Sequence, residues 1–416
     1  MIATYRRALG IPGALGFSAA GLLARLPIAM MGIGIVLLVT DHTGSYATAG
    51  RLTAVYVIGN AVGALPIARL VDSIGQRVVL LPAGLVSAAA LALFVVAVTE
   101  GWSPAVQYAG AAVAGTTFPN AGSAVRARWA HVVDDRGTLE TAFAWEAVAD
   151  ETVFILGPTL VTLLAAAFSP VAALVLAVSA LLTGIVWLTA QRGTEPPVLT
   201  AEEEAARGVA RPMPWLALVP LVAVAFLLGT MFGGAEVATI ALADEQDRPA
   251  MAGVILALWA VGSLVAGLVT GALDFRSSAA ARLRGGLLGL AVLMSPTPFI
   301  GDLLGMGGLL LVAGLAIAPT LIAATSWIES IVPPRRLNEG LAVFHTALVV
   351  GVAPGAAVTG AVVDHLGASA SYWVPAGAAI AGAAVGGLSL LGAGPPRRED
   401  ARIGTAPPIG VTEGRR

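Results

Sequence analysis

Apolar stretches long enough to cross a membrane recur from one end of this chain to the other, and no other feature constrains its fold as strongly. A hydrocarbon core about 30 Å thick needs roughly 20 apolar residues per helical crossing. Because water cannot satisfy the backbone at that depth, runs of this length must be helical. The composition agrees, since 57% of the 416 residues are hydrophobic and 12% are charged, whereas soluble domains have roughly 25% charged residues. The sequence therefore predicts an all-α integral membrane protein.

Twelve stretches bounded by charged or turn residues are predicted to be transmembrane helices. They cover residues 13–39, 46–69, 77–98, 104–125, 140–166, 170–190, 214–242, 250–272, 284–302, 304–330, 338–363 and 372–393. Ser103-Pro104 and Ser169-Pro170 are expected to open the fourth and sixth helices, because serine can accept an unpaired amide and proline has none. A proline-rich segment at 295–298 interrupts the ninth stretch, and every later span would reverse direction if this stretch did not cross.

The placement of arginine predicts the orientation, since cytoplasmic loops carry an excess of basic residues. All 23 basic residues are arginine, and most fall in alternate loops or at the termini. Those before the last predicted span are Arg6, Arg7, Arg77, Arg126, Arg128, Arg136, Arg192, Arg207, Arg211, Arg276, Arg282, Arg284, Arg335 and Arg336. The intervening loops hold mainly acidic residues. Both termini are therefore expected in the cytoplasm, which requires an even number of crossings such as twelve.

A long polar interval divides the chain into two halves of six predicted helices. The expected parts are an N-terminal six-helix bundle (1–190), a cytoplasmic linker (191–213), a C-terminal six-helix bundle (214–394) and a disordered cytoplasmic tail (395–416). An offset of 198 residues places Trp129 on Trp327 and Gly157 on Gly355, which indicates that the halves are repeats. Parallel repeats of this kind occur in transporters whose substrate site lies between two pseudo-symmetric bundles.

The predicted loop between the second and third helices, residues 68–77, reads Ala-Arg-Leu-Val-Asp-Ser-Ile-Gly-Gln-Arg. This segment resembles the G-x-L-a-D-r-x-G-r-k signature of the major facilitator superfamily at Asp72, Gly75 and Arg77. The resemblance implies a transporter in which these three residues form a cytoplasmic gate. Asp72 is then expected beside the start of the eleventh helix, where it accepts amides, since a helix N-terminus favours negative charge.

Gly157-Pro158 in the fifth helix resembles the core of the motif found in the twelve-helix drug:proton antiporters of that superfamily. The rest of the motif departs, because Val153, Val161 and Thr162 stand where glycines are expected. The arginine usual in the fourth helix is also absent from the predicted membrane interior. The resemblance implies proton-coupled export of a drug or metabolite. Proton-coupled import of a sugar, peptide or other metabolite is the alternative, and a channel is favoured least.

Few ionisable side chains lie deep inside the predicted spans. They are Arg25, Glu146, Asp150, Glu151, Glu236 and His345. A charge at the bilayer centre costs about 2.5–3.5 kcal/mol, so such groups usually face a water-filled cavity or one another. We expect Arg25 to contact Asp150 or Glu151. Glu236 is expected to carry the coupling proton or bind a cationic part of the substrate, behind an open notch left by Gly229 and Gly233. Glu146 and His345 have a second interpretation as capping or snorkelling side chains.

Two stripes of polar and small residues follow single helix faces. The second helix carries Thr53, Tyr56, Asn60 and Gly63, and the fourth carries Thr116, Asn120 and Ser123. Such stripes either line a cavity or let helices pack closely. The superfamily resemblance favours a cavity for the fourth helix, because helices 1, 4, 7 and 10 then surround the central path, and both interpretations stay open for the second. The candidate substrate-binding residues are Asn120, Thr116, Tyr56 and Asn60.

Enzymatic functions find little support in the residues. A chain without lysine cannot contain the phosphate-binding loop of an ATP-driven pump, and no His-Glu-x-x-His metalloprotease motif is present. Gly301-Asp302 resembles part of an intramembrane aspartyl protease motif, but Phe299 replaces the preceding glycine. No cofactor or metal site is predicted. The expected partners are a small-molecule substrate, protons and membrane lipid, without nucleic acid, for a monomer in a plasma or bacterial inner membrane.

Overall fold

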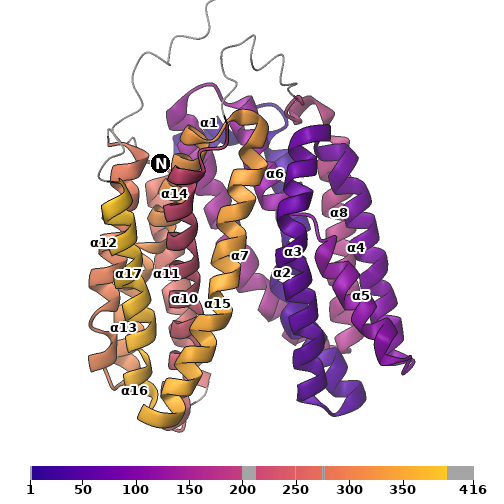
Figure 1. Ribbon diagram of the computed structural model, residues 1–416, viewed down its shortest axis with the longest axis vertical. Coiled ribbons are helices and arrows are strands. Elements are labelled where there is room, and N and C mark those ends of the chain that lie inside the picture. Colours follow the sequence, from indigo (N-terminus) through magenta and orange to yellow (C-terminus); the bar gives the residue numbers. More distant parts are fainter. Residues whose placement is uncertain (1, 199–211, 249, 274, 276, 391–416) are drawn as a thin grey trace, which may run out of the picture.

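The computed structural model of the chain describes residues 2–198, 212–248, 250–273, 275 and 277–390. Within these residues every regular element is helical and no strand occurs. The helices run roughly along the long axis in two bundles that lie side by side, the N-terminal half in indigo to magenta and the C-terminal half in red to yellow (Figure 1). By length and composition, nine helical segments of the described chain can cross a membrane.

The N-terminal half contains α1 (Ile2–Leu9), α2 (Ala14–Thr43), α3 (Tyr46–Ile74), α4 (Gln76–Thr99), α5 (Pro104–Thr116), α6 (Ala121–Val132), α7 (Arg136–Ala167), α8 (Pro170–Ala190) and the 3₁₀ turn η1 (Arg192–Thr194). The C-terminal half contains α10 (Trp215–Glu245), α11 (Ala250–Thr270), α12 (Ala279–Met294), η2 (Thr297–Phe299), α13 (Leu303–Gly314), α14 (Ile317–Ile331), η3 (Pro334–Arg336), α15 (Leu337–Leu366), α16 (Ala368–Ser371) and α17 (Trp373–Leu390). The three expected spans outside the nine correspond to α5 with α6, α12 and α17, which are interrupted or short.

The expected fourth and tenth helices are each broken into two. The first break covers residues 117–120, and the second lies at Leu315 and Ala316. The offset of 198 carries 117–120 onto 315–318, so the breaks occupy equivalent places in the two halves. Asn120 ends the first break as the cap of α6, because its side chain accepts the N–H of Ser123 at 3.2 Å. The repeat detected in the sequence is therefore accompanied by the same irregularity in both halves.

Several predicted boundaries are wrong: α3 continues to Ile74, so much of the predicted loop 68–77 is helical, and α12 ends at Met294 rather than 302. Two further errors involve arginine. α6 continues to Val132, so Arg126 and Arg128 are helical and buried rather than in a loop. α12 begins at Ala279, because Ser278 caps it, and Arg282 consequently lies inside the helix. An arginine lowers the local hydropathy even when other side chains pair with it. A helix predicted from hydropathy therefore stops before such an arginine, or starts after it, even when the real helix includes it.

Side-chain caps explain several polar residues at helix starts. Ser169 accepts the N–H of Ala172 at 3.1 Å, as predicted for the start of α8. α5 begins at Pro104 as expected, but the Ser103 side chain makes no capping bond. Asp302, the candidate protease residue, caps α13 by accepting the N–H of Gly305 at 2.7 Å. Its position is thus accounted for by helix capping.

The predicted linker lies partly outside the described residues, since 199–211 are not among them, and the predicted tail 395–416 lies wholly outside them. The start of the linker is folded onto the N-terminal half. One terminal nitrogen of Arg128 donates to the carbonyl of Gln191 and to the hydroxyl of Thr194, both at 2.8 Å. We call the end of the molecule at which residues 198 and 212 lie the linker end.

Candidate functional site

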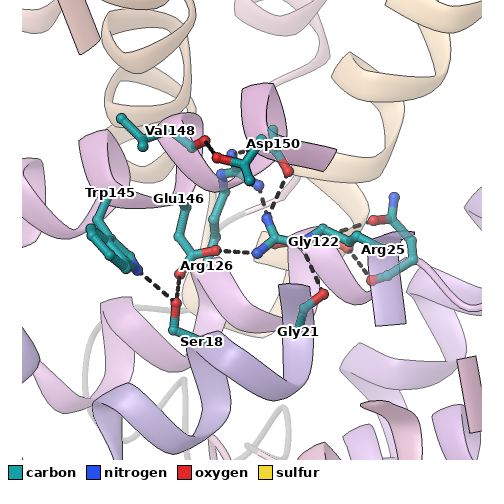
Figure 2. A network of polar contacts seen from close by, with 12 residues as sticks. Ser18, Gly21, Arg25, Gly122, Arg126, Trp145, Glu146, Val148 and Asp150 are labelled. Atoms are coloured by element: carbon teal, nitrogen blue, oxygen red, sulfur yellow. Dashed lines mark hydrogen bonds and ion pairs between the residues drawn. The ribbon is translucent and has the colours of Figure 1, made fainter. Parts of the chain in front are cut away.

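Four charged side chains, three of them buried and that of Asp150 29% exposed, form a cluster where α2, α6 and α7 meet (Figure 2). Arg25 on α2 donates to Glu146 at 2.5 Å and to Asp150 at 2.7 Å, both on α7. Arg126 on α6 donates to the second oxygen of Asp150 at 2.6 Å. Two guanidinium groups thus face two carboxylates, and the charge cluster (Arg25, Arg126, Glu146 and Asp150) has no net formal charge. Because the positive and negative side chains balance, they can remain charged in the interior, where a single unpaired charge is costly.

Helical spacing places these side chains. Glu146 and Asp150 are four residues apart and therefore share one face of α7. Each arginine is braced by the carbonyl four residues before it, since Arg25 donates to Gly21 at 3.0 Å and Arg126 donates to Gly122 at 3.3 Å. These local bonds fix the direction of both guanidinium groups toward α7 (Figure 2).

Glu146 is fully buried and accepts more hydrogen bonds than its arginine alone provides. One oxygen accepts from the hydroxyl of Ser18 at 2.6 Å and from the indole N–H of Trp129 at 2.9 Å. The same hydroxyl accepts the indole N–H of Trp145 at 2.9 Å. The interpretation of Glu146 as a snorkelling or capping residue is therefore wrong, because its carboxylate lies inside the N-terminal half.

The predicted contact between Arg25 and a neighbouring acid is confirmed, and the acid is Asp150. Glu151 points elsewhere and accepts a hydrogen bond from the hydroxyl of Ser263 on α11, at 2.6 Å, in the other half. Arg126 is the member that sequence reasoning missed, because we expected no arginine inside the fourth span. Charge balance offered a signal: Arg25 as the sole interior cation would have left Glu146 and Asp150 with a net negative charge.

The cluster lies at the boundary with the C-terminal half. His345 on α15 is within electrostatic reach of Arg25, Arg126 and Asp150, and its Nδ1 lies 2.8 Å from the carbonyl of Leu341. α6 and α15 are in contact. His345 therefore faces the other half at the level of the cluster.

The cluster has no counterpart in the C-terminal half. The offset of 198 carries Arg126 onto Ala324, Glu146 onto Phe344 and Asp150 onto Leu348. Accordingly, the indole N–H of Trp327, the equivalent of Trp129, has no hydrogen-bond partner within the described residues. The two halves share a fold and a packing pattern, but within the described residues the C-terminal half has no cluster of two arginines and two acids at the equivalent positions.

Asp72 near the end of α3 lies against the first turn of α15, as predicted. Its Oδ1 accepts the backbone N–H of Asn338 at 3.3 Å and the Asn338 side-chain amide at 2.7 Å. Its Oδ2 accepts the backbone N–H of Glu339 at 2.8 Å. Gly75 ends α3 with φ of +97°, a conformation that side-chain-bearing residues rarely adopt. Arg77 donates its backbone N–H to Glu195 at 2.8 Å, and within the described residues it makes no hydrogen bond with α15.

Further polar contacts join the two halves, and we call the whole set, with the bonds of Asp72, the seam. Its hydrogen bonds are Tyr5–Gly267, Tyr5–Leu268, Arg69–Glu339, Asp72–Asn338, Asp72–Glu339, Glu140–Arg282 and Glu151–Ser263. Within the described chain these bonds lie at the linker end or near mid-depth. Burial raises the pKa of Tyr5, on α1, to about 12, so its hydroxyl stays a donor at neutral pH. The seam therefore closes the linker end.

The candidate substrate residues on α3 and α5 lie close together, in a tight helix contact. A Cβ on Gly63 would lie 1.8 Å from the carbonyl oxygen of Thr116, so the two backbones touch. The Tyr56 side chain is buried, with its ring centroid 6.5 Å from that of Phe118. Asn60 is half-buried beside this contact. Close packing accounts for much of the stripe, and a role for Tyr56, Asn60, Thr116 or Asn120 in substrate binding stays a prediction.

Glu236 on α10 faces the N-terminal half. By helical period it lies between the face that meets α15, at Gly233, and the face where Phe232 packs on Trp259 of α11. Both α11 and α15 contact the other half. The Glu236 side chain is exposed, and no protein group within the described residues bonds it.

The predicted notch beside Glu236 is wrong. A Cβ on Gly229 would lie 1.9 Å from the carbonyl oxygen of Leu348, and one on Gly233 would lie 2.1 Å from that of Val352. The two glycines therefore let α10 and α15 approach closely, and the α15 backbone fills the space. Among the described residues, no group of three or more His, Asp or Glu side chains is placed to hold a metal ion.

The family of the chain follows from comparison with known proteins. The model of the Major Facilitator Superfamily matches residues 17–311, well over half of the sequence. The chain belongs to the Major Facilitator Superfamily. It is accordingly a multi-pass membrane transporter rather than an enzyme, and the predicted family is confirmed. No curated protein sequence matches it.

Solved structures of other transporters have the same fold. The human organic anion transporter TETRAN is 18% identical, with a TM-score of 0.70 over 91% of this chain and 99% of that one. A bacterial homologue of the iron transporter ferroportin, in an outward-facing state, is 13% identical, with a TM-score of 0.74 over 90% and 98%. The E. coli fucose:proton symporter is 12% identical, with a TM-score of 0.70 over 91% and 98%. At these identities the likeness shows the fold alone.

Proposed function

We propose that this superfamily member exports a small organic solute in exchange for protons, by alternating access. The observation that carries the proposal is the position of Glu236. Its carboxylate is exposed toward the other half, about 32 Å along α10 from the linker end, while the seam holds that end closed. A titratable group open to one side and shut off from the other is what alternating access coupled to protons requires.

The orientation extends the same proposal. The linker end is the cytoplasmic end, with twelve crossings and both termini in the cytoplasm of a plasma or bacterial inner membrane. The arginine distribution supports this orientation. The structure is then closed to the cytoplasm, and one similar solved structure is described as outward-facing. Opening the cytoplasmic side requires the seam bonds of Asp72 and Glu151 to break together.

The charge cluster has a supporting role in this scheme. Its four charges are mutually paired, so it holds α2, α6 and α7 as one unit while His345 of the other half lies beside it. Rigid units of this kind can rock against each other without exposing ions to lipid. Glu236, which has no such partner, is left as the acid that exchanges protons.

The proposed direction of transport rests on the Gly157-Pro158 motif of α7. Gly157 lies where α7 meets α2, and a Cβ on it would lie 2.6 Å from the Cβ of Ala29. Gly157-Pro158 resembles the antiporter motif at this contact, which supports export. Import by proton symport is the second candidate, because the same acid could load substrate and proton together, and one similar structure is a fucose:proton symporter.

Reconstitution tests the proposal in two steps. A panel of metabolites and drugs is first screened for thermal stabilisation of the purified protein, since a ligand that binds the folded state raises its melting temperature. Liposomes containing the protein are then loaded with the best ligand. Counterflow distinguishes a carrier from a channel, because an open pore shows no trans-stimulation. Export predicts uphill movement of the ligand against an opposing proton flux; movement in the same direction as protons would establish the symporter instead.

A further inference from the structure

An apolar groove with a volume of about 930 Å³ runs between α3, α10 and α15, remote from Glu236. Its walls include Val62 and Leu65 of α3, Val219 and Ala223 of α10, and Ala347 of α15. Arg69 of α3 is the one charged residue that lines it. We call this feature the lateral groove. One wall belongs to the N-terminal half and two belong to the C-terminal half, so the groove spans the boundary that the seam closes.

The lateral groove opens on the outer surface of the molecule. On α15 its lining residues include Val343, Ala347 and Val350, whereas His345 is turned toward the charge cluster in the interior. The helical period puts these lining positions roughly 140–160° away from His345 around the helix axis. Val219 is 62% exposed and Val350 is 45% exposed. In a membrane this surface meets acyl chains.

The linker end of the groove carries an exposed guanidinium group. Arg69 and Arg336 donate from their Nε atoms to the two oxygens of Glu339, at 2.8 and 2.7 Å. Two cations thus share one carboxylate, and the formal charges balance when Asp72, which accepts the backbone N–H of the same Glu339, is included. The side chain of Arg69 is 52% exposed, and its two terminal nitrogens have no protein partner within the described residues. A guanidinium fork of this kind fits the oxygens of a phosphate.

We propose that the lateral groove binds one anionic phospholipid of the cytoplasmic leaflet. An acyl chain lies along the apolar walls, and the lipid phosphate accepts hydrogen bonds from the free nitrogens of Arg69. The depth fits, because Arg69 is five residues, or about 8 Å, from the end of α3. Since the walls come from both halves, the lipid bridges them and favours the conformer closed at the linker end. The proposal rests on the proposed orientation, not on the substrate or the coupling ion.

Native mass spectrometry of the full-length protein tests this site without any transport assay. Delipidated protein is titrated with phosphatidylglycerol or with phosphatidylcholine of the same acyl chains. The parental protein is expected to retain one phosphatidylglycerol and to bind it about tenfold more tightly than phosphatidylcholine. Val219→Trp fills the groove and should weaken both lipids. Val292→Trp is the matched control, since Val292 is 68% exposed on α12 and does not line the groove.

Two further variants separate lipid binding from the ion pair at the seam. Arg69→Gln removes the phosphate ligand and should reduce phosphatidylglycerol binding to the phosphatidylcholine level. Glu339→Gln breaks the same ion pair but leaves Arg69 charged and unshared, so it should bind phosphatidylglycerol at least as tightly as the parental protein. If both variants lose the lipid equally, Arg69 acts only through the ion pair and the proposal fails. Equal affinity for the two lipids, or unchanged binding in Val219→Trp, also overturns it.

Discussion

Asp72 on α3 caps the first turn of α15 by accepting the backbone N–H of Glu339 at 2.8 Å. The two residues belong to different halves, so a helix-capping bond serves here as a contact between bundles. Asn338 adds a backbone and a side-chain donor to the other carboxylate oxygen. The N-terminus of α15 also carries a partial positive charge of about half a unit, which favours the carboxylate. Separating the two halves at the linker end would therefore break the hydrogen bonds of the Asp72 carboxylate and leave the first turn of α15 without its cap.

Asp72→Ala is expected to shift the protein toward a conformer that is open at the linker end and to slow transport. The natural sequence has no cysteine, so a single reporter can be introduced without further changes. Ala147→Cys suits this purpose, because Ala147 is 9% exposed and packs with Ala318 and Ile322 of the other half. Maleimide should label this cysteine several-fold faster in the Asp72→Ala background.

An always-accessible reporter controls for general loosening in this experiment. Arg136→Cys lies at the same end on a side chain that is 54% exposed and should label at one rate in both backgrounds. Unchanged labelling at Ala147→Cys together with parental transport would show that Asp72 does not hold the linker end closed.

The pair of Arg25 and Asp150 should show strong energetic coupling. Removing one member of a buried ion pair leaves an uncompensated charge and typically costs about 3–5 kcal/mol. Arg25→Ala and Asp150→Ala should each destabilise the protein, and the double variant should lose less than the sum, by about 0.5–3 kcal/mol. The loss of stability of each variant is measured by denaturant or thermal unfolding in detergent. Transport should follow the same order.

Glu151 supplies a control for that cycle because it is adjacent to Asp150 but bonds Ser263 instead. Arg25→Ala combined with Glu151→Ala should be close to additive. Additive losses in the Asp150 cycle as well would contradict the pairing, and strong coupling only with Glu151 would reverse the assignment.

The Arg25 pair was predictable because few ionisable residues lie in the spans and a buried guanidinium needs a partner. The choice between Asp150 and Glu151 was not, since neighbouring residues point about 100° apart on a helix and each of these two meets a polar group. Arg126 was beyond reach for another reason. The break at 117–120 separates α5 from α6, which carries Arg126, and the sequence pattern did not predict this break. Hydropathy also cannot distinguish an arginine paired inside the protein from one in a loop.

The contacts of Asp72 and Gly75 were predicted more completely than the packing of the polar stripe. Asp72 and Gly75 have fixed roles in the capping of helix ends, and the loop signature alone carries that geometry. The polar stripe with Tyr56 and Thr116 is different, because the same small and hydroxyl residues serve both packing and a cavity. Which use prevails depends on how near the neighbouring helix lies, and no local pattern encodes that distance.

Gly63 should be intolerant of any side chain. A Cβ there would lie 1.8 Å from a backbone oxygen, that of Thr116, so α3 and α5 would have to move apart. Gly63→Ala is expected to lower the free energy of unfolding by about 1–3 kcal/mol, as overpacking does. Gly32→Ala is the control, because nothing lies within 4 Å of a Cβ at Gly32 on α2, and alanine favours a helix by up to about 1 kcal/mol. Similar stability of the two variants would refute the close helix contact.

Glu236→Gln should abolish transport driven by a pH gradient while sparing exchange. Glutamine keeps the shape of the side chain but cannot take up or release a proton at neutral pH. Counterflow between equal proton concentrations needs only substrate binding and the conformational change, so it should persist. In liposomes, the variant should therefore exchange labelled substrate yet fail to accumulate it.

Glu100→Gln provides the matched control for this variant, because Glu100 is an exposed acid at the end of α4, away from the linker end. It should retain both activities. Loss of counterflow as well as accumulation in Glu236→Gln would assign Glu236 to substrate binding, in keeping with a cationic substrate group. Accumulation at the parental rate would exclude Glu236 as the proton carrier and leave the role to the charge cluster. In that case Asp150 would be the acid to replace next, since it bridges both arginines of the charge cluster.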